Sequence, residues 1–227
     1  MTMKSRIGNV LQQIQASAQA ANRDAQSILL LAVSKTQPAS AVQTAYDAGL
    51  HAFGENYLQD ALSKIESLAQ LDIQWHFIGP IQSNKTRAIA ENFSWVHTIE
   101  REKIARRLNE QRPTTLPPLQ VCIQVNISEE SNKAGVTPDA VTALASVIRE
   151  CPRLTLRGLM AIPQASNDPT TQLAAFNKLA NLQKKLITQG YALDTLSMGM
   201  SNDMDAAIQA GATIVRIGTA IFGPRVK

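Results

Sequence analysis

The chain alternates between short apolar stretches and longer amphipathic stretches, which predicts strands that are each followed by a helix. Residues 28–33 are apolar throughout, as in a strand that is buried on both faces of a parallel sheet. Pro38 then fits the first turn of a helix. The same succession recurs along the chain, and we expect strands near residues 28–33, 51–53, 73–78, 94–98, 119–126, 154–160, 194–198 and 213–217.

An additional helix is predicted before the first strand. Apolar residues recur at intervals of three and four over residues 3–22, which is the spacing of one buried helix face. We expect this helix to cover the bottom of the fold. Residues 1–227 are predicted to form a single domain, with the N-terminal helix inside residues 1–26 and the strand–helix units in residues 28–227.

Repeated units of a strand followed by a helix predict parallel strands joined by right-handed crossovers. About eight such units fill the chain, so we predict an α/β fold with a single (β/α)8 barrel. An open, doubly wound sheet is the alternative. That fold more often carries a glycine-rich nucleotide fingerprint after its first strand, where this chain has Ser34, Lys35 and Thr36 instead.

Composition excludes several classes of protein. The chain is 44% hydrophobic and 18% charged, with a net charge of +4, which indicates a packed core. The densest basic cluster, residues 101–107, includes acidic neighbours on a predicted helix, so a solvated helix face explains it better than a nucleic-acid site. No apolar run approaches the roughly 20 residues that span a membrane, and residues 1–15 lack the apolar region of a secretory signal.

The two cysteines, Cys122 and Cys151, lie far apart and show no metal-ligand spacing. We therefore expect free thiols, no metal site and a cytoplasmic protein. Cys122 falls within an apolar strand pattern, which favours an inert thiol in the core.

Lys35 is the first candidate for chemistry, because it follows the first strand at its carboxyl end, where α/β folds place catalytic groups. Burial disfavours the charged ammonium, and a neutral amine attacks a carbonyl to form a Schiff base. The alternative is a lysine whose ammonium simply reaches out to water.

Two candidate phosphate-binding turns follow the last two strands. Ser201 to Asp203 opens one predicted helix, with Ser201 as its expected N-cap, and Gly218 and Thr219 open the final turn. Both offer backbone N–H groups and a hydroxyl, and barrels often bind phosphate with the loops after strands seven and eight. Ordinary capping would explain either turn alone, but their joint occurrence at these two units favours phosphate binding.

A lysine that traps carbonyls and a phosphate cradle together describe a small ligand with an aldehyde and a phosphate, and pyridoxal 5′-phosphate (PLP) fits. Arg216, on the last strand, would then face the pyridine nitrogen. A guanidinium has no acceptor and stays charged, so it disfavours protonation of that nitrogen and leaves the ring a weak electron sink. This suits storage of the cofactor or a restricted reaction such as racemisation. Aldolase-like chemistry of Lys35 on a sugar phosphate is another alternative.

The sequence resembles the pyridoxal-phosphate homeostasis proteins, whose barrel is similar to the N-terminal barrel of alanine racemase. The most specific segment is residues 75–85, WHFIGPIQSNK, and residues 32–35, 53–57, 158–160, 196–203 and 215–223 also match. The resemblance implies fold type III of the PLP proteins without the second, β-rich domain. It implies Lys35 as the Schiff-base lysine, and it assigns the other cofactor-binding positions to Asn56, His76, Met198, Ser201, Arg216, Gly218 and Thr219.

The same resemblance implies a PLP carrier that buffers the free cofactor and supplies acceptor enzymes, and not an established catalyst. A PLP-dependent amino-acid racemase is the alternative. Racemases of this fold use a second domain and a second base opposite the lysine, and we expect this chain to lack that domain and to act as a monomer. His76 and His97 are the only histidines expected at the rim. Lys133 matches a family lysine on a loop near the site, where it either handles the cofactor transiently or has no role.

Overall fold

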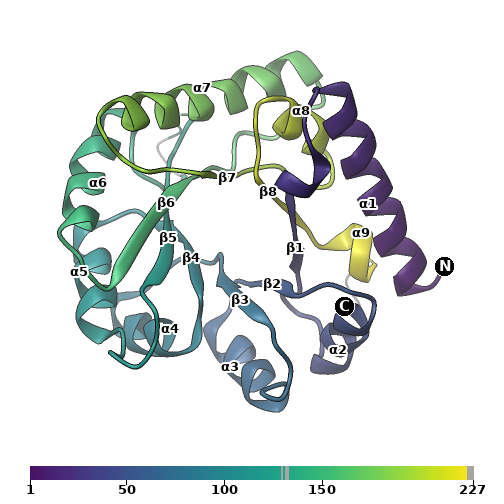
Figure 1. The fold of residues 1–227 in the computed structure, drawn as a ribbon, viewed down its shortest axis with the longest axis horizontal. Helices are drawn as coiled ribbons and strands as arrows, with labels where there is room; N and C mark the ends of the chain where they lie inside the picture. The colour runs from purple at the N-terminus through teal and green to yellow at the C-terminus, as the bar shows by residue number, and fades with distance from the viewer. Residues whose placement is uncertain (129, 131–132, 224–227) are drawn as a thin grey trace.

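The computed structural model describes residues 1–128, 130 and 133–223, and within them eight parallel strands form a closed barrel in chain order (Figure 1). Each strand pairs with its sequence neighbours, and β1 closes the barrel against β8. The predicted (β/α)8 barrel is therefore confirmed. The strands are β1 Leu29–Val33, β2 Ala52–Glu55, β3 Gln74–Phe77, β4 Trp95–Ile99, β5 Leu119–Gln124, β6 Leu154–Met160, β7 Thr195–Ser197 and β8 Ile214–Ile217.

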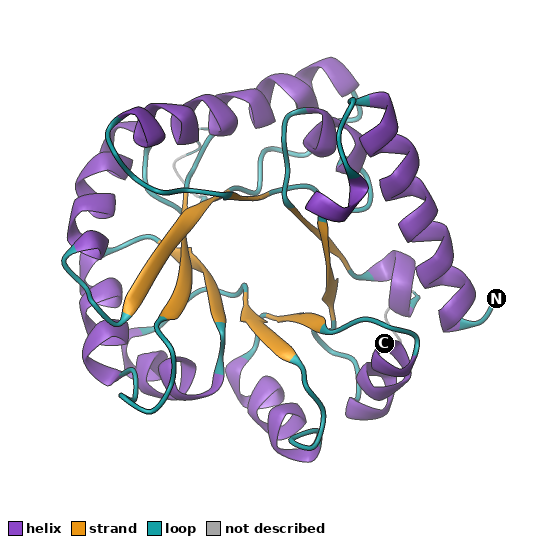
Figure 2. Cartoon of the chain, in the orientation of Figure 1, coloured by secondary structure: helices purple, strands orange, loops and turns teal. Residues whose placement is uncertain are grey.

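Helices surround the barrel on its outside (Figure 2). Among the described residues, the α-helices are α1 Met3–Ala20, α2 Ala39–Asp47, α3 Leu58–Ser67, α4 Thr86–Asn92, α5 Glu102–Gln111, α6 Val141–Arg149, α7 Pro169–Thr188, α8 Met204–Gln209 and α9 Thr219–Phe222, and the short 3₁₀ helices are η1 Ala25–Ser27, η2 Ser83–Lys85 and η3 Pro138–Ala140. In the part of the chain described, no helix combines the length and apolar character that crossing a membrane requires.

The prediction that the N-terminal helix covers the bottom of the fold is wrong. Helix α1 lies in the outer layer, where it contacts α2, α8 and α9 (Figure 1). The last two helices are short, with six and four residues, so α1 covers the seam where the barrel closes. Its apolar face, which includes Ile7, Val10 and Ile14, is buried there.

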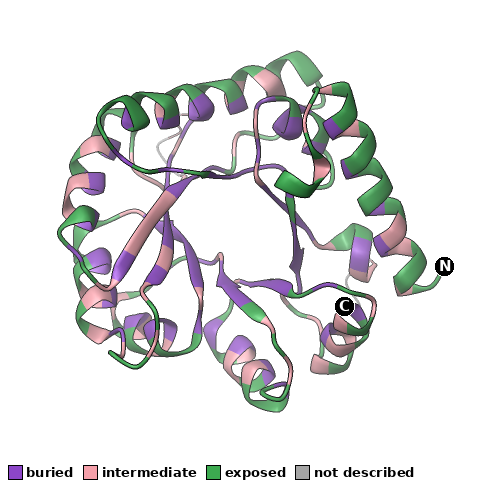
Figure 3. Ribbon diagram, in the orientation of Figure 1, coloured by how far each residue is buried: buried purple, intermediate pink, exposed green. Residues whose placement is uncertain are grey.

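The strands are largely buried (Figure 3), and the alternation of side chains along them produces two cores. Outward-facing residues pack against the helices, whereas Leu31, Trp95, Cys122 and Met160 are among those that form a separate cluster inside the barrel. Burial raises the pKa of the Cys122 thiol to about 12. The thiol therefore stays protonated at neutral pH, as expected of an inert core cysteine.

Candidate functional site

The carboxyl ends of the parallel strands meet at one rim, and most of the predicted site residues follow them. Lys35 comes two residues after β1 and is half-buried, and Asn56 directly follows β2. At Gly218, after β8, an added Cβ would lie 3.2 Å from the carbonyl oxygen of Val33. The backbone that precedes Lys35 and the start of the last turn are therefore close neighbours.

The backbone before Lys35 is fixed by a buried cluster of polar groups. Ser34 Oγ donates to Glu55 Oε1 at 2.6 Å, and Lys64 Nζ donates to the same oxygen at 2.8 Å. Lys64 Nζ also donates to the carbonyl oxygen of Ser34 at 2.9 Å and pairs with Asp60 at 3.0 Å. After Lys35, Thr36 adopts a φ of 65°, a conformation that is costly for a β-branched residue.

Burial raises the pKa of Glu55, and its hydrogen bonds with Lys64 and Ser34 oppose the rise. Its other oxygen, Oε2, is buried and has no hydrogen-bond partner among the described residues. Sequence reasoning gave Glu55 no role and did not consider Lys64. A signal for Lys64 exists, because it stands three residues after Ala61 and four before Leu68, at the spacing of the buried helix face.

Two of the three phosphate-side candidates, Ser201 and Thr219 but not Gly218, line one cavity of about 840 Å³, which we call the rim cavity. Its lining includes Ser201, Thr219 and Lys133, whereas Lys35, Asn56, Met198 and Arg216 do not line it. Lys133 pairs with Glu130 at 2.6 Å. The structure thus brings the loop lysine to the same cavity as the two turns.

The prediction that Ser201 caps a helix is wrong. Helix α8 begins later, at Met204, and Asp203 is its N-cap residue. Residues 200–203 form a turn in which the Met200 N–H donates to Asp203 Oδ1 at 2.6 Å, and Ser201 is exposed. Burial raises the pKa of Asp203. Gly218, in contrast, directly precedes α9, of which Thr219 is the first residue.

Arg216 points into the barrel, where it is 5% exposed. Its Nη1 donates to Ser197 O at 2.6 Å and to Ser197 Oγ at 2.9 Å, and its Nη2 donates to Ala161 O at 3.1 Å. Burial lowers the pKa of this guanidinium to about 10, so it remains charged at neutral pH. Met198, next to Ser197, is fully buried.

The two histidines expected at the rim lie below it, inside the barrel and with no exposed surface. Nδ1 of His76 is 2.9 Å from Nε2 of His97, and the His76 ring stacks on Trp95 with the centroids 5.3 Å apart. Burial lowers the pKa of His76 to about 3. Burial, His76 and Arg216 all lower the pKa of His97. Both imidazoles are therefore neutral at physiological pH.

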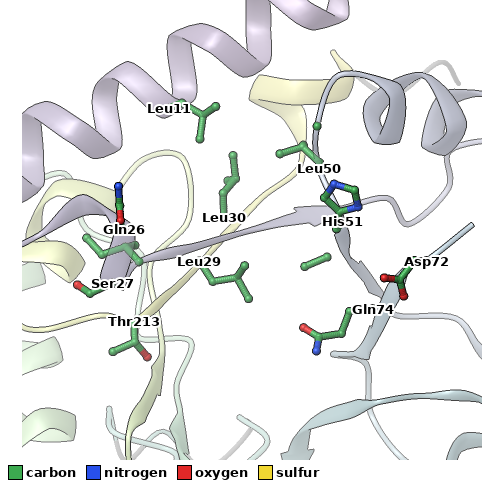
Figure 4. A pocket seen from close by; sticks show the side chains of 13 residues that line it. Leu11, Gln26, Ser27, Leu29, Leu30, Leu50, His51, Asp72, Gln74 and Thr213 are labelled. Carbon is green, nitrogen blue, oxygen red and sulfur yellow. The ribbon is translucent and has the colours of Figure 1, made fainter.

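A second hollow, of about 610 Å³, lies at the amino ends of the strands (Figure 4). Leu29, Gln74 and Thr213, at or next to the starts of β1, β3 and β8, are among the residues that line it. None of the predicted site residues does. This hollow is at the opposite end of the barrel from Lys35, so it is separate from the rim site.

Residues 10–226 match the family model of the alanine racemase N-terminal domain. A curated relative from Pseudomonas aeruginosa, the pyridoxal phosphate homeostasis protein, is 57% identical over 224 residues, which cover 99% of this chain and 96% of that protein.

Among solved structures, PipY of Synechococcus elongatus with PLP bound is 32% identical with a TM-score of 0.86, over 98% of this chain and 100% of that one. Alanine racemase from Corynebacterium glutamicum is 18% identical with a TM-score of 0.69, over 95% of this chain and 61% of that one. This last likeness concerns the fold alone.

Proposed function

The chain belongs to the pyridoxal phosphate homeostasis protein family, and from that premise we propose that it holds PLP as a Schiff base on Lys35, buffers the free cofactor and supplies it to acceptor enzymes. The observation that carries the proposal is one rim that presents a half-buried lysine on a fixed backbone beside the turn that opens at Gly218. PLP supplies the aldehyde that a lysine amine traps. The PLP-bound relative supports the choice of cofactor.

The residues present fit a phosphate. The first N–H groups of a helix have no acceptor within the helix, and such groups favour anions. In the proposal, Gly218 and Thr219 offer these N–H groups at α9, and Ser201 offers a hydroxyl from across the rim cavity. The Asn56 side chain would meet the ring, because its Oδ1 is buried and has no hydrogen-bond partner among the described residues.

Arg216 favours storage over catalysis in this scheme. Its guanidinium is charged and donates to two carbonyl oxygens and a hydroxyl. It could donate a hydrogen bond to the pyridine nitrogen of the cofactor and would then oppose protonation of the ring. In the proposed site, His76 approaches the ring from inside the barrel, and the buried Met198, directly after β7, lines its surroundings from the strand end.

The racemase alternative needs a second base opposite Lys35. The two histidines considered for that task are fully buried, neutral and bonded to each other. This supports a carrier.

Lys133 faces the rim cavity, and we propose that it handles the cofactor transiently during entry or release. We also propose that the protein acts as a monomer in the cytoplasm.

The first experiment is an absorbance titration with PLP, with and without borohydride, followed by mass spectrometry of peptides. Wild-type protein is expected to retain PLP on Lys35 after reduction, and Lys35→Ala is expected to retain none at that position. Lys178→Ala, on the exposed face of α7, is the matched control and should behave as wild type. Equal labelling in Lys35→Ala and the control would contradict the lysine assignment.

A second experiment separates a carrier from an enzyme. Loaded protein is mixed with an acceptor apoenzyme and a scavenger of free PLP, and recovery of the acceptor's activity reports transfer. In parallel, L- and D-amino acids are incubated in deuterium oxide with loaded protein. Exchange of the Cα hydrogen at ordinary enzyme rates would overturn the carrier in favour of the racemase. Sedimentation velocity tests the monomer.

A further inference from the structure

Five side chains form a continuous line of hydrogen bonds across the inside of the barrel. From Arg216 on β8, the line passes to Ser197 Oγ on β7 at 2.9 Å. Ser197 Oγ is 2.8 Å from Nδ1 of His97 on β4. The line continues through the 2.9 Å contact with His76 on β3 and ends at Gln74 Oε1, 3.0 Å from His76 Nε2. Strands β3 and β4 lie opposite β7 and β8 in the barrel (Figure 1), so the line spans its interior.

The direction of these hydrogen bonds follows from the Arg216 end. A guanidinium only donates, so Ser197 Oγ accepts from Arg216. The proton of this buried hydroxyl then goes to His97 Nδ1, the other hydrogen-bond contact of Ser197 Oγ among the described residues. A neutral imidazole with one accepting nitrogen carries its proton on the other. His97 therefore donates from Nε2 to His76 Nδ1, and His76 donates from Nε2.

The Gln74 end independently requires the same direction. The amide oxygen of Gln74 only accepts, so His76 Nε2 must carry a proton and His76 Nδ1 must accept. This makes His97 a donor at Nε2 and an acceptor at Nδ1. Both ends thus assign the Nε2–H tautomer to both histidines, and every donor along the line points away from Arg216.

We propose that Ser197, His97 and His76 are positioning residues for Arg216, which hold its guanidinium at the angle required by the pyridine nitrogen of PLP. This inference rests on the proposed function, because it assigns a purpose to the Arg216 side of that site. The neighbouring interior residues, including Leu31, Cys122 and Met160, form an apolar cluster. Gln74 anchors the line at the opposite end, where it lines the second hollow (Figure 4).

The direction of the hydrogen bonds along the line is tested first, on protein without PLP. Long-range proton–nitrogen NMR spectra of protein labelled with [¹⁵N]histidine distinguish the two tautomers, and the chain has three histidines. Two of them should be neutral Nε2–H tautomers at pH 7, and His51→Gln assigns the third signal. An Nδ1–H tautomer at His76 or His97 would overturn the inference whether or not the protein binds PLP.

The positioning part is tested with Ser197→Ala, which removes the link between Arg216 and His97. Loss of one hydrogen bond is expected to weaken PLP binding about fivefold, or about 1 kcal/mol at 1.4 kcal/mol per tenfold. The absorption maximum of the bound cofactor should also move, and Ser197→Thr, which keeps a hydroxyl, should restore both. Thr98→Val is the control, since it removes a buried hydroxyl on β4 that donates to Gly79 O at 2.6 Å outside the line. It should lower stability and leave PLP binding unchanged.

A double-mutant cycle then shows whether Ser197 acts through Arg216. In an Arg216→Lys background, Ser197→Ala should have no further effect on PLP affinity. Equal effects in both backgrounds, or a Ser197→Ala protein that loses stability but binds PLP as the wild type does, would overturn the positioning role. Failure of the proposed function looks different, because the wild-type protein itself would then retain no PLP on Lys35.

Discussion

The buried histidine pair predicts that the protein without PLP loses stability as the pH falls below about 6.5. Burial lowers the pKa of His76 from an ordinary value of 6.5 to about 3. At pH values between 3 and 6.5, His76 is protonated in the unfolded chain and neutral in the folded protein. The free energy of unfolding therefore decreases as the pH falls, and the stability contributed by the neutral imidazole is complete only above pH 6.5.

The magnitude follows from the same two values. One group with this linkage changes the free energy of unfolding by up to about 1.4 kcal/mol per pH unit. Over the full interval from pH 6.5 to 3, His76 alone accounts for about 5 kcal/mol, which is comparable to the whole stability of many domains. His97, whose pKa is also lowered, acts in the same direction.

Glu55 opposes this trend. Its pKa is raised by burial, so the folded protein binds this proton at a higher pH than the unfolded chain does, and acidification stabilises the fold through this group. Hydrogen bonds from Thr171 lower the pKa of Asp168. The stability that this carboxylate contributes is therefore lost only when the pH falls below about 3.8, the ordinary pKa of an aspartate. The interval from pH 6.5 to 4.5 therefore reports mainly the histidines, with Glu55 and Asp203, whose pKa values are both raised by burial, reducing the slope towards its lower end.

The assay is urea unfolding, followed by circular dichroism, at half-unit steps from pH 7.5 to 4.5. Wild-type protein should show a falling free energy of unfolding below pH 6.5. His76→Gln and His97→Gln should flatten the slope, and His51→Gln, on the surface, should keep it. A wild-type stability that is constant across the interval, or a slope unchanged in both buried variants, would refute the reasoning.

Three further substitutions have definite expected outcomes. Lys64→Met leaves buried carboxylate and carbonyl oxygens without their ammonium, and urea unfolding should show a loss of about 3–5 kcal/mol; a loss below about 1 kcal/mol would contradict the role of this cluster. Gly218→Ala places a Cβ 3.2 Å from Val33 O. Titrations should therefore show weaker binding of PLP but an unchanged reaction with pyridoxal, which lacks the phosphate. An equal loss of affinity for PLP and pyridoxal would argue against a phosphate site there. Gly158→Ala places a Cβ in direct collision with Thr195 O, between β6 and β7, and circular dichroism should therefore show no native fold. A cooperative thermal transition near that of the wild type would disprove this.

The barrel was predictable because the sequence pattern of a strand followed by a helix repeats along the chain. Each strand is a short apolar run, each helix has its own periodicity, and eight successive units leave few alternatives. The positions after β1 and β8 follow directly from that pattern, so Lys35 and Gly218 could be located at the rim. The chemistry of these positions remains a prediction.

The rest of the site depends on three-dimensional contacts, which the spacing of residues along the sequence does not reveal. His97 is the third residue of β4, and only the closed barrel shows that it lies in the interior opposite Ser197. Ser201 and Asp203 are both good N-cap residues, and the first backbone hydrogen bond of the helix, from Ala207 N–H to Asp203 O, decides between them. The role of Lys64, on α3, depends on Glu55 and Ser34, which lie at the ends of two strands.

The place of α1 in the outer layer has a consequence for biosynthesis. Arg6 donates to the carbonyl oxygen of Ile221 at 2.6 Å across 215 positions of sequence, and β1 pairs with β8. A ribosome therefore exposes the apolar face of α1 long before the strands and helices that cover it have been made. Contacts of such long range slow folding. We expect nascent chains to stay sensitive to protease until β8 and α9 have emerged, so that the closing of the barrel is the event that ends this sensitivity.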